Sequence, residues 1–250
     1  MTDSVAARVR HAEHVMGTVV SFDVPASVVL TPVLEWLHWV DERFSPFRAD
    51  SDVSRLGRGE LTLEQCVPEL AEVMSACTAM RAATSGYFTV YPDGTFDPCG
   101  YVKGWAIERA SDMLTAAGSE NHIVNGGGDV QCLGQREPGV PWRLGVAHPL
   151  RPGLLACAVT ASDDTFAMAT SGTAERGVHI YDPIAGRPAE GFASITITGP
   201  RISLADAYAT AAFAMGPAAR EWVESLAGYE AFAITPSGSV WRTSGFSAAP

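Results

Sequence analysis

The order of helix-like and strand-like segments is the feature that most constrains the fold. Segment 14–24 alternates and is rich in valine, which predicts a strand, whereas apolar residues recur at helical spacing over 33–44 and 67–84. Further helices are expected over 104–117 and 204–216, with strand-like segments between them. Because helices and strands mix without a regular βαβ alternation, the sequence predicts an α+β fold rather than a doubly wound parallel sheet.

Composition limits the possible classes of protein. The chain has 250 residues, of which 47% are hydrophobic, so it can form a sizeable core. No long linker interrupts it, and we expect one domain over 1–250. A formal net charge of -11 argues against a general nucleic-acid binder. Five cysteines without a CxxC pair suggest neither a zinc site nor a disulfide framework.

No run of residues approaches the roughly 20 apolar residues that a membrane-spanning helix needs. The first 17 residues carry charged side chains and histidines where a signal peptide would have an apolar run. We therefore expect a chain without a membrane span that stays in the cytoplasm.

Two glycine-rich segments are candidates for binding an anion or a flat ring. Residues 97–105, DPCGYVKGW, precede an expected helix, so backbone N–H groups and the charge of Lys103 suit a phosphate or pyrophosphate. Residues 125–129, NGGGD, lie between two expected strands and suit a ring or a phosphate. A tight turn into a helix and an ordinary hairpin turn are the respective structural alternatives.

Asp206 and Thr210 lie four residues apart in an expected helix, so they share one face. A carboxylate and a hydroxyl can hold a hard cation, and Mg²⁺ suits such a sparse site when a substrate phosphate supplies further oxygens. In the alternative, Asp206 caps the helix and Thr210 bonds to a backbone carbonyl.

His179 follows a strand-like segment and precedes the turn signal DPIAG, where it could act as a general base or could simply be structural. Met16 stands beside Gly17, where its thioether could pack on an aromatic ring or lie in the core. The sequence contains no GxSxG, HExxH or P-loop motif, so serine hydrolase, zinc protease and nucleotide kinase chemistry have no support.

The order of these segments resembles the ApbE family, the FAD:protein FMN transferases. The chain runs MGT, FSPFRADSDVSRL, TSGYF, DPCGYVKGW, NGGGDV, TSG, HIYDPIAG and ADAYATAAF over about residues 14–245. The resemblance implies the ApbE-type fold, with mixed sheets, packed helices and two interlocked lobes. It also implies transfer of the FMN half of FAD to a threonine of an acceptor protein, with release of AMP and dependence on Mg²⁺ or, alternatively, Mn²⁺.

The resemblance also assigns roles to single residues. Asp206, Thr210 and Gly100 match positions that contact the magnesium ion, and His179 matches the family's base. The residues that it places around FAD are Met16, Tyr87, Phe88, Thr89, Asp97, Lys103, Asn125, Gly127, Asp129 and Ile180.

Four residues depart from the family pattern: Cys99 and Val102 replace glycine and alanine, Thr89 stands where many members have aspartate, and Ala185 replaces threonine. Two alternatives also remain open on the sequence. The same site could hydrolyse FAD to FMN and AMP, or the chain could bind flavin without catalysis.

Overall fold

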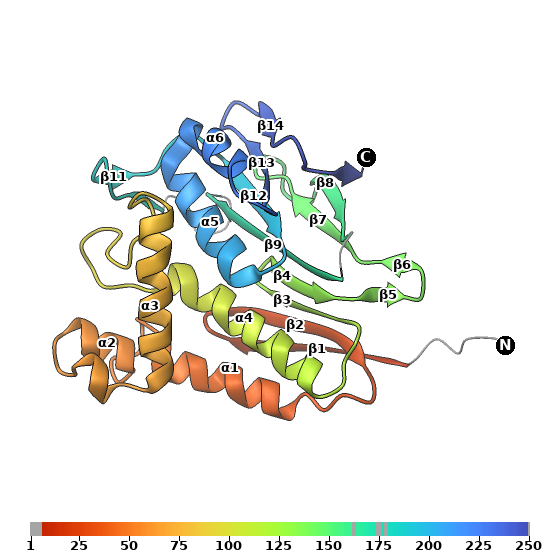
Figure 1. Ribbon diagram of the computed structural model, residues 1–250, viewed down its shortest axis with the longest axis horizontal. Coiled ribbons are helices and arrows are strands. Elements are labelled where there is room, and N and C mark those ends of the chain that lie inside the picture. Colours follow the sequence, from red (N-terminus) through yellow and green to blue (C-terminus); the bar gives the residue numbers. More distant parts are fainter. Residues whose placement is uncertain (1–6, 162–163, 174–176, 178–179, 250) are drawn as a thin grey trace.

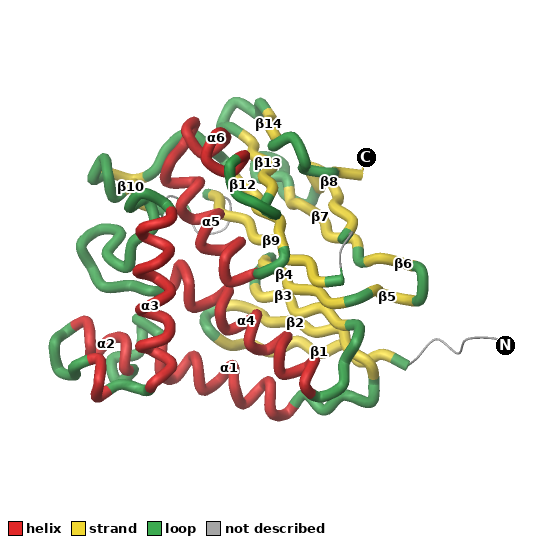
Figure 2. The backbone as a smooth tube through the Cα atoms, in the orientation of Figure 1, coloured by secondary structure: helices red, strands yellow, loops and turns green. Residues whose placement is uncertain are grey.

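An eight-stranded antiparallel sheet forms the centre of the molecule (Figures 1 and 2). The computed structural model describes residues 7–161, 164–173, 177 and 180–249. In spatial order the strands are β1 (Arg8–Val15), β2 (Thr18–Pro25), β3 (His122–Gly126), β4 (Asp129–Leu133), β9 (Thr165–Gly172), β12 (Ser194–Gly199), β13 (Glu230–Ile234) and β14 (Val240–Arg242).

Three smaller sheets accompany it. The largest has the order β15-β8-β7, and two-stranded ribbons are formed by β5 with β6 and by β10 with β11. Their bounds are β5 (Gln135–Glu137), β6 (Val140–Pro141), β7 (Arg143–Ala147), β8 (Leu155–Thr160), β10 (Tyr181–Asp182), β11 (Arg187–Pro188) and β15 (Ala248–Ala249).

The helices gather on one face of the central sheet, with α4 and α5 packed against each other and against the strands (Figure 1). The α-helices are α1 (Thr31–Phe44), α2 (Asp52–Gly57), α3 (Pro68–Ala83), α4 (Cys99–Ala116), α5 (Ile202–Met215) and α6 (Ala219–Glu224). Two 3₁₀ turns, Leu63–Gln65 and Gly216–Ala218, complete the described helical structure.

Side-chain alternation along the strands divides the core between the two faces of the sheet. Ile195 and Ile197 of β12 are buried in the cluster that the helices share. A separate cluster on the opposite face contains Met168 and Phe232 from the central sheet and Leu144 from the three-stranded sheet. The α+β prediction is confirmed, because this antiparallel sheet with helices needs no βαβ units.

Three local predictions are wrong. Segment 14–24 is not one strand but the turn and second strand of the β1–β2 hairpin, and Met16 lies in that turn with φ 54°. The polar, turn-rich segment 45–56 predicts a loop, but it contains the start of α2, which Ser51 caps by accepting a hydrogen bond from the Ser54 N–H. Helix α4 begins at Cys99 rather than near Gly104, so Lys103 belongs to the helix and not to the turn before it.

None of the helices in the described part of the chain is long and apolar enough to cross a membrane.

Candidate functional site

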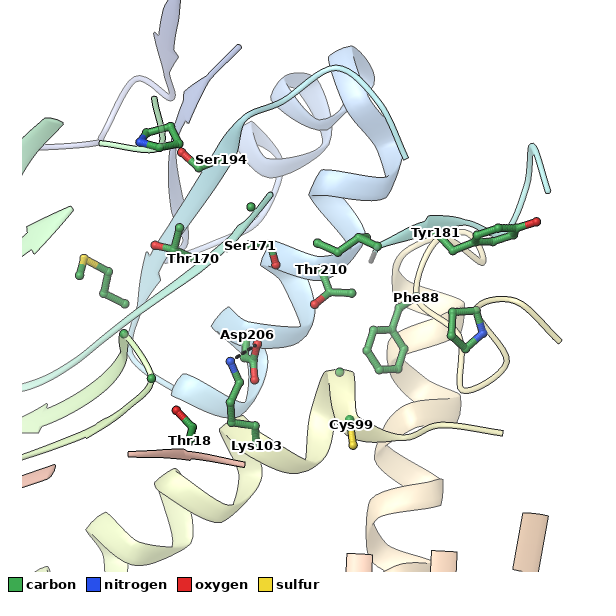
Figure 3. A pocket seen from close by; sticks show the side chains of 18 of the residues that line it. Thr18, Phe88, Cys99, Lys103, Thr170, Ser171, Tyr181, Ser194, Asp206 and Thr210 are labelled. Carbon is green, nitrogen blue, oxygen red and sulfur yellow. Dashed lines mark ion pairs between the residues drawn. The ribbon is translucent and has the colours of Figure 1, made fainter. Parts of the chain in front are cut away.

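A cavity of about 340 Å³ opens where α4, α5 and the ends of β9 and β12 meet (Figure 3). Such a volume is in the range of small-molecule sites. The cavity is lined by ten of the residues predicted from the sequence: Tyr87, Phe88, Thr89, Asp97, Gly100, Lys103, Gly127, Ile180, Asp206 and Thr210.

Three predicted residues do not line the cavity. Asp129 lies behind it, where it pairs with Lys103 and accepts the Thr170 N–H at 2.9 Å. Asn125 accepts the Gly128 N–H at 2.9 Å and so holds the glycine turn. Met16 packs against the main core from the β1–β2 turn. His179 lies outside the described residues.

Lys103 lies between two buried carboxylates. Its Nζ pairs with Asp129 and lies 3.6 Å from Asp206 Oδ1, and Figure 3 shows Lys103 and Asp206 pointing toward each other from α4 and α5. Burial raises the pKa of the Asp206 carboxyl well above its ordinary value, Lys103 opposes the shift and Asp129 reinforces it. When both carboxyls are ionised, their charge exceeds that of the one ammonium, and a further cation at this place would offset the difference.

Gly104 allows α4 and α5 to approach closely enough for this arrangement. A Cβ at Gly104 would lie 2.7 Å from the Ile202 carbonyl oxygen and 3.0 Å from the Asp206 Cβ. The Gly104 N–H also donates to Asp206 Oδ2 at 3.1 Å. Asp206 therefore does not cap its own helix, which begins four residues earlier at Ile202, but bonds to the neighbouring helix.

The donor atoms beside Asp206 suit a hard cation. Thr210 lies one helical turn further along α5 and also lines the cavity. A Cβ at Gly100 would lie 3.7 Å from the Thr210 side chain, so the first turn of α4 lies beside Thr210. Among the described residues no group of three or more His, Cys, Asp or Glu side chains could hold a metal. A cation here would take few protein ligands, as Mg²⁺ does when phosphate oxygens complete its shell.

The glycine turn between β3 and β4 requires glycine at 127. Gly127 has φ +61°, and a Cβ there would lie 2.5 Å from Thr18 Oγ1. Its N–H donates to the Val19 carbonyl at 3.1 Å, which fixes the turn against β2. The predicted hairpin is thus confirmed, and the same turn forms one wall of the cavity through Gly127 and Gly128.

The segment before α4 combines a carboxylate that holds the local backbone with an aromatic wall. Asp97 Oδ1 accepts the Cys99 N–H at 2.8 Å. Phe88 is buried and would lie 3.3 Å from a Cβ at Gly100. The replacement of glycine by Cys99 is accommodated because this residue lines the cavity at the start of the helix. Val102 is buried in the main core.

The turn after Ile180 keeps its shape without a threonine at 185. Asp182 Oδ1 accepts the N–H groups of both Ile184 and Ala185 at 2.9 Å. These bonds use the backbone of residue 185, so alanine fits. The hairpin so formed places Ile180 and Tyr181 on the wall of the cavity.

The sequence analysis did not find the part of the site formed by the sheet. The additional lining residues on or beside strands are Thr18, Gly145, Ala147, His148, Pro149, Met168, Thr170, Ser171, Gly172 and Ser194. The TSG run at 170–172 was a signal for this wall, but strand β9 itself was not predicted. The loop before α4 contributes Pro92 and Cys99.

The cavity brings a lysine, buried carboxylates and a glycine turn around one space, an arrangement whose chemistry suits a phosphate-containing ligand. The sequence model of the ApbE family matches residues 91–233, more than half of the chain. The protein belongs to the ApbE family.

Relatives and solved structures agree with this membership. The chain is 29% identical over 217 residues to the FAD:protein FMN transferase of Rhodobacter capsulatus, covering 83% of this chain and 38% of that protein. It is 33% identical over 123 residues to the protein of that name from Vibrio cholerae, covering 46% and 36%. The chain thus spans about two fifths of the length of these curated relatives.

Two solved structures have the same fold. The ApbE protein of Thermotoga maritima matches with a TM-score of 0.83 at 24% identity, covering 95% of this chain and 97% of that one. The flavin transferase ApbE of Vibrio cholerae matches with a TM-score of 0.79 at 23% identity, covering 96% and 98%. The predicted ApbE-type fold is therefore confirmed.

Proposed function

We propose that this protein transfers the FMN half of FAD to a threonine hydroxyl of an acceptor protein and releases AMP. Curated relatives carry the name FAD:protein FMN transferase, which supports this activity. The observation that carries the proposal is the buried Asp206, which faces Lys103 and shares a cavity wall with Thr210.

Lys103 is the positive charge that would hold the diphosphate of FAD. Its Nζ stays within reach of the cavity because Asp129 fixes it from behind. The Gly127–Gly128 turn lets the ligand approach the backbone, because Gly128 has no atom within 4 Å of a Cβ position. Phe88 offers an aromatic surface on the other side of Gly100.

Asp206, Thr210 and the backbone near Gly100 are the residues that would hold Mg²⁺, with Mn²⁺ as an alternative of similar ligand preference. When bound, the cation would offset negative charge on the diphosphate and make AMP a better leaving group. The excess negative charge at Asp129 and Asp206 supports this assignment.

The chemical step exchanges the phosphoanhydride bond of FAD for a phosphoester bond to the acceptor. The threonine oxygen of the acceptor forms a bond to the phosphorus of the FMN half, and the bond from that phosphorus to the AMP oxygen breaks. AMP leaves with the bonding electron pair. The hydroxyl proton passes to a base, for which His179 is the candidate by its match to the family motif.

Incubation with FAD and Mg²⁺, with and without a candidate acceptor domain, tests this proposal. We expect AMP and a flavin-sized mass gain on the acceptor, which its Thr→Ala variant should lose. AMP and free FMN at the same rate without acceptor would instead indicate a hydrolase. Intact FAD in both samples would indicate a protein that only binds flavin.

Asp206→Asn tests the metal assignment. We expect at least a 100-fold slower release of AMP that excess Mg²⁺ only partly restores, because a buried cation ligand is weakened. Asp50→Asn is the matched control, since Asp50 is an exposed carboxylate outside the cavity. An Asp206→Asn protein with the normal rate and the normal Mg²⁺ dependence would contradict the assignment.

A further inference from the structure

Strand β9 has an open edge inside the cavity. Its pairing with β4 runs only from Thr165 to Met168, whereas its pairing with β12 continues to Gly172 opposite Ser194. The Thr170 N–H points to the β4 side, since it donates to Asp129 Oδ1. Because backbone direction alternates along a strand, the N–H and carbonyl of Gly172 face the same side, beyond the end of β4.

Ser194, next to this edge, has a buried hydroxyl without a hydrogen bond. The residue is 4% exposed and lines the cavity. Its Oγ is the one buried side-chain oxygen or nitrogen atom without a hydrogen-bond partner in the described part of the chain. A buried hydroxyl without a hydrogen-bond partner is unfavourable, so its presence calls for an explanation.

The neighbouring hydroxyls on the same face of the sheet are satisfied. Thr170 Oγ1 and Thr196 Oγ1 bond to each other at 2.8 Å. Ser194 lies two residues before Thr196 on the same strand, opposite Gly172, which has no side chain with which to pair. The missing partner of Ser194 must therefore come from the cavity.

The charge distribution indicates what kind of ligand group fits. Lys103 is the only Lys or Arg among the described residues that line the cavity, and it pairs with Asp129 and Asp206. Figure 3 shows Ser194 and Thr170 at one end of the cavity, away from Phe88 and Tyr181 at the other. A phosphate at the Ser194 end would have no Lys or Arg beside it among the described lining residues, so a neutral polar group is favoured there.

We propose that Met168, Thr170, Gly172 and Ser194 form a subsite for the polar edge of a planar nitrogen heterocycle. Ser194 Oγ and the peptide groups of Gly172 together supply donors and acceptors for the adjacent donor and acceptor atoms of such a ring. The Met168 thioether lines the same wall and suits contact with a ring. This inference rests on the proposed function, because FAD carries two such rings, the flavin and the adenine.

Ser194→Ala tests the subsite, with binding of FAD, FMN and AMP measured by calorimetry. We expect FAD to bind roughly 3- to 10-fold more weakly, as for the loss of one hydrogen bond. The same loss should occur for FMN alone if the ring is the flavin, and for AMP alone if it is the adenine. In turnover, KM for FAD should rise with kcat unchanged, since a hydrogen bond to the ring would be made equally in the ground state and in the transition state.

The ligand-free protein separates binding from folding. Removing an unpartnered hydroxyl should leave the urea midpoint unchanged or raise it, whereas a structural role would lower it. Ser239→Ala, in the exposed turn between β13 and β14, is the matched control. Ser194→Cys, which keeps a weak donor, should recover part of the affinity.

Unchanged affinity of Ser194→Ala for all three ligands would overturn the subsite, as would a lowered urea midpoint with equal losses for FMN and AMP. Either result for Ser194→Ala can be told apart from failure of the proposed function. A wild-type protein that binds FMN or AMP but never releases AMP from FAD would refute the transferase and still allow the Ser194 comparison.

Discussion

Gly104→Ala probes how tightly the site depends on the contact between α4 and α5. Alanine in a helix interior is normally more stable than glycine by about 1 kcal/mol. Here the new Cβ would lie 2.7 Å from the Ile202 carbonyl oxygen and 2.9 Å from the Ser203 Cα. Both are backbone atoms, so no side chain can move aside.

The required displacement follows from these distances. The shortest contact is about 0.7 Å below the 3.4 Å at which ordinary van der Waals contact begins. Moving the helices apart by that amount would stretch the 3.1 Å bond from the Gly104 N–H to Asp206 Oδ2 to about 3.8 Å, beyond hydrogen-bond range. Overpacking of this kind costs about 1–3 kcal/mol and outweighs the gain in helix propensity.

Urea unfolding and FAD turnover measure the two effects. We expect the unfolding free energy to fall by about 1–3 kcal/mol, and AMP release to slow by about 10- to 100-fold because Lys103 and Asp206 separate. Thr115→Ala on the exposed side of α4 is the control and should be neutral or slightly stabilising. A Gly104→Ala protein as stable and as active as wild type would refute the reasoning.

Three further changes test other parts of the structure. The pKa of buried His122 is lowered to about 4, mainly by burial. As the pH falls from 7 to 5 the unfolded chain therefore takes up a proton at this histidine before the folded chain does, and the free energy of unfolding should fall by about 2 kcal/mol. Urea midpoints measured at both pH values should differ less in His122→Gln than in the wild type. Glu108→Ala should lower the free energy of unfolding by about 1–2 kcal/mol, because Glu108 accepts the Ser203 N–H at 3.0 Å at the start of α5 and pairs with Arg201. An unchanged midpoint in thermal unfolding would contradict this. Gly127→Ala should destabilise the protein by about 1–3 kcal/mol and weaken FAD binding, since φ +61° and Thr18 both oppose a Cβ; equal binding by calorimetry would argue against a role for the turn.

Local sequence patterns predicted the elements that are marked by glycine runs or by helical spacing of side chains. The glycine run at 126–128 marked the β3–β4 hairpin, and the four-residue spacing of Asp206 and Thr210 placed both on one wall of the cavity. The start of α4 was missed because Gly100 and Gly104 have a low intrinsic helix propensity, which favours a turn in this segment. In the structure the glycine at 104 serves contact with α5, a tertiary reason that no local pattern contains.

The sheet side of the site was not predictable from local spacing. Ser194 and Gly172 come from two strands that are 22 residues apart and meet only through the register of β9 with β12. The resemblance placed Asp129 around FAD, and in the structure its side chain pairs with Lys103 and accepts the Thr170 N–H behind the cavity wall. The pairing register of the strands decides which residues meet at such positions, and local patterns in a single sequence do not specify that register.

The unequal lengths of β4 and β9 make the ligand space adjustable without a change of fold. Strand β9 is eight residues long and β4 is five, and the hairpin between β3 and β4 ends where the open edge begins. Two residues inserted on each side of the Gly127–Gly128 turn would let β4 continue along Thr170 and Gly172. The longer β3–β4 hairpin would then occupy the space beside the open edge and narrow the cavity. The length of one hairpin therefore sets whether this scaffold has room for a ligand.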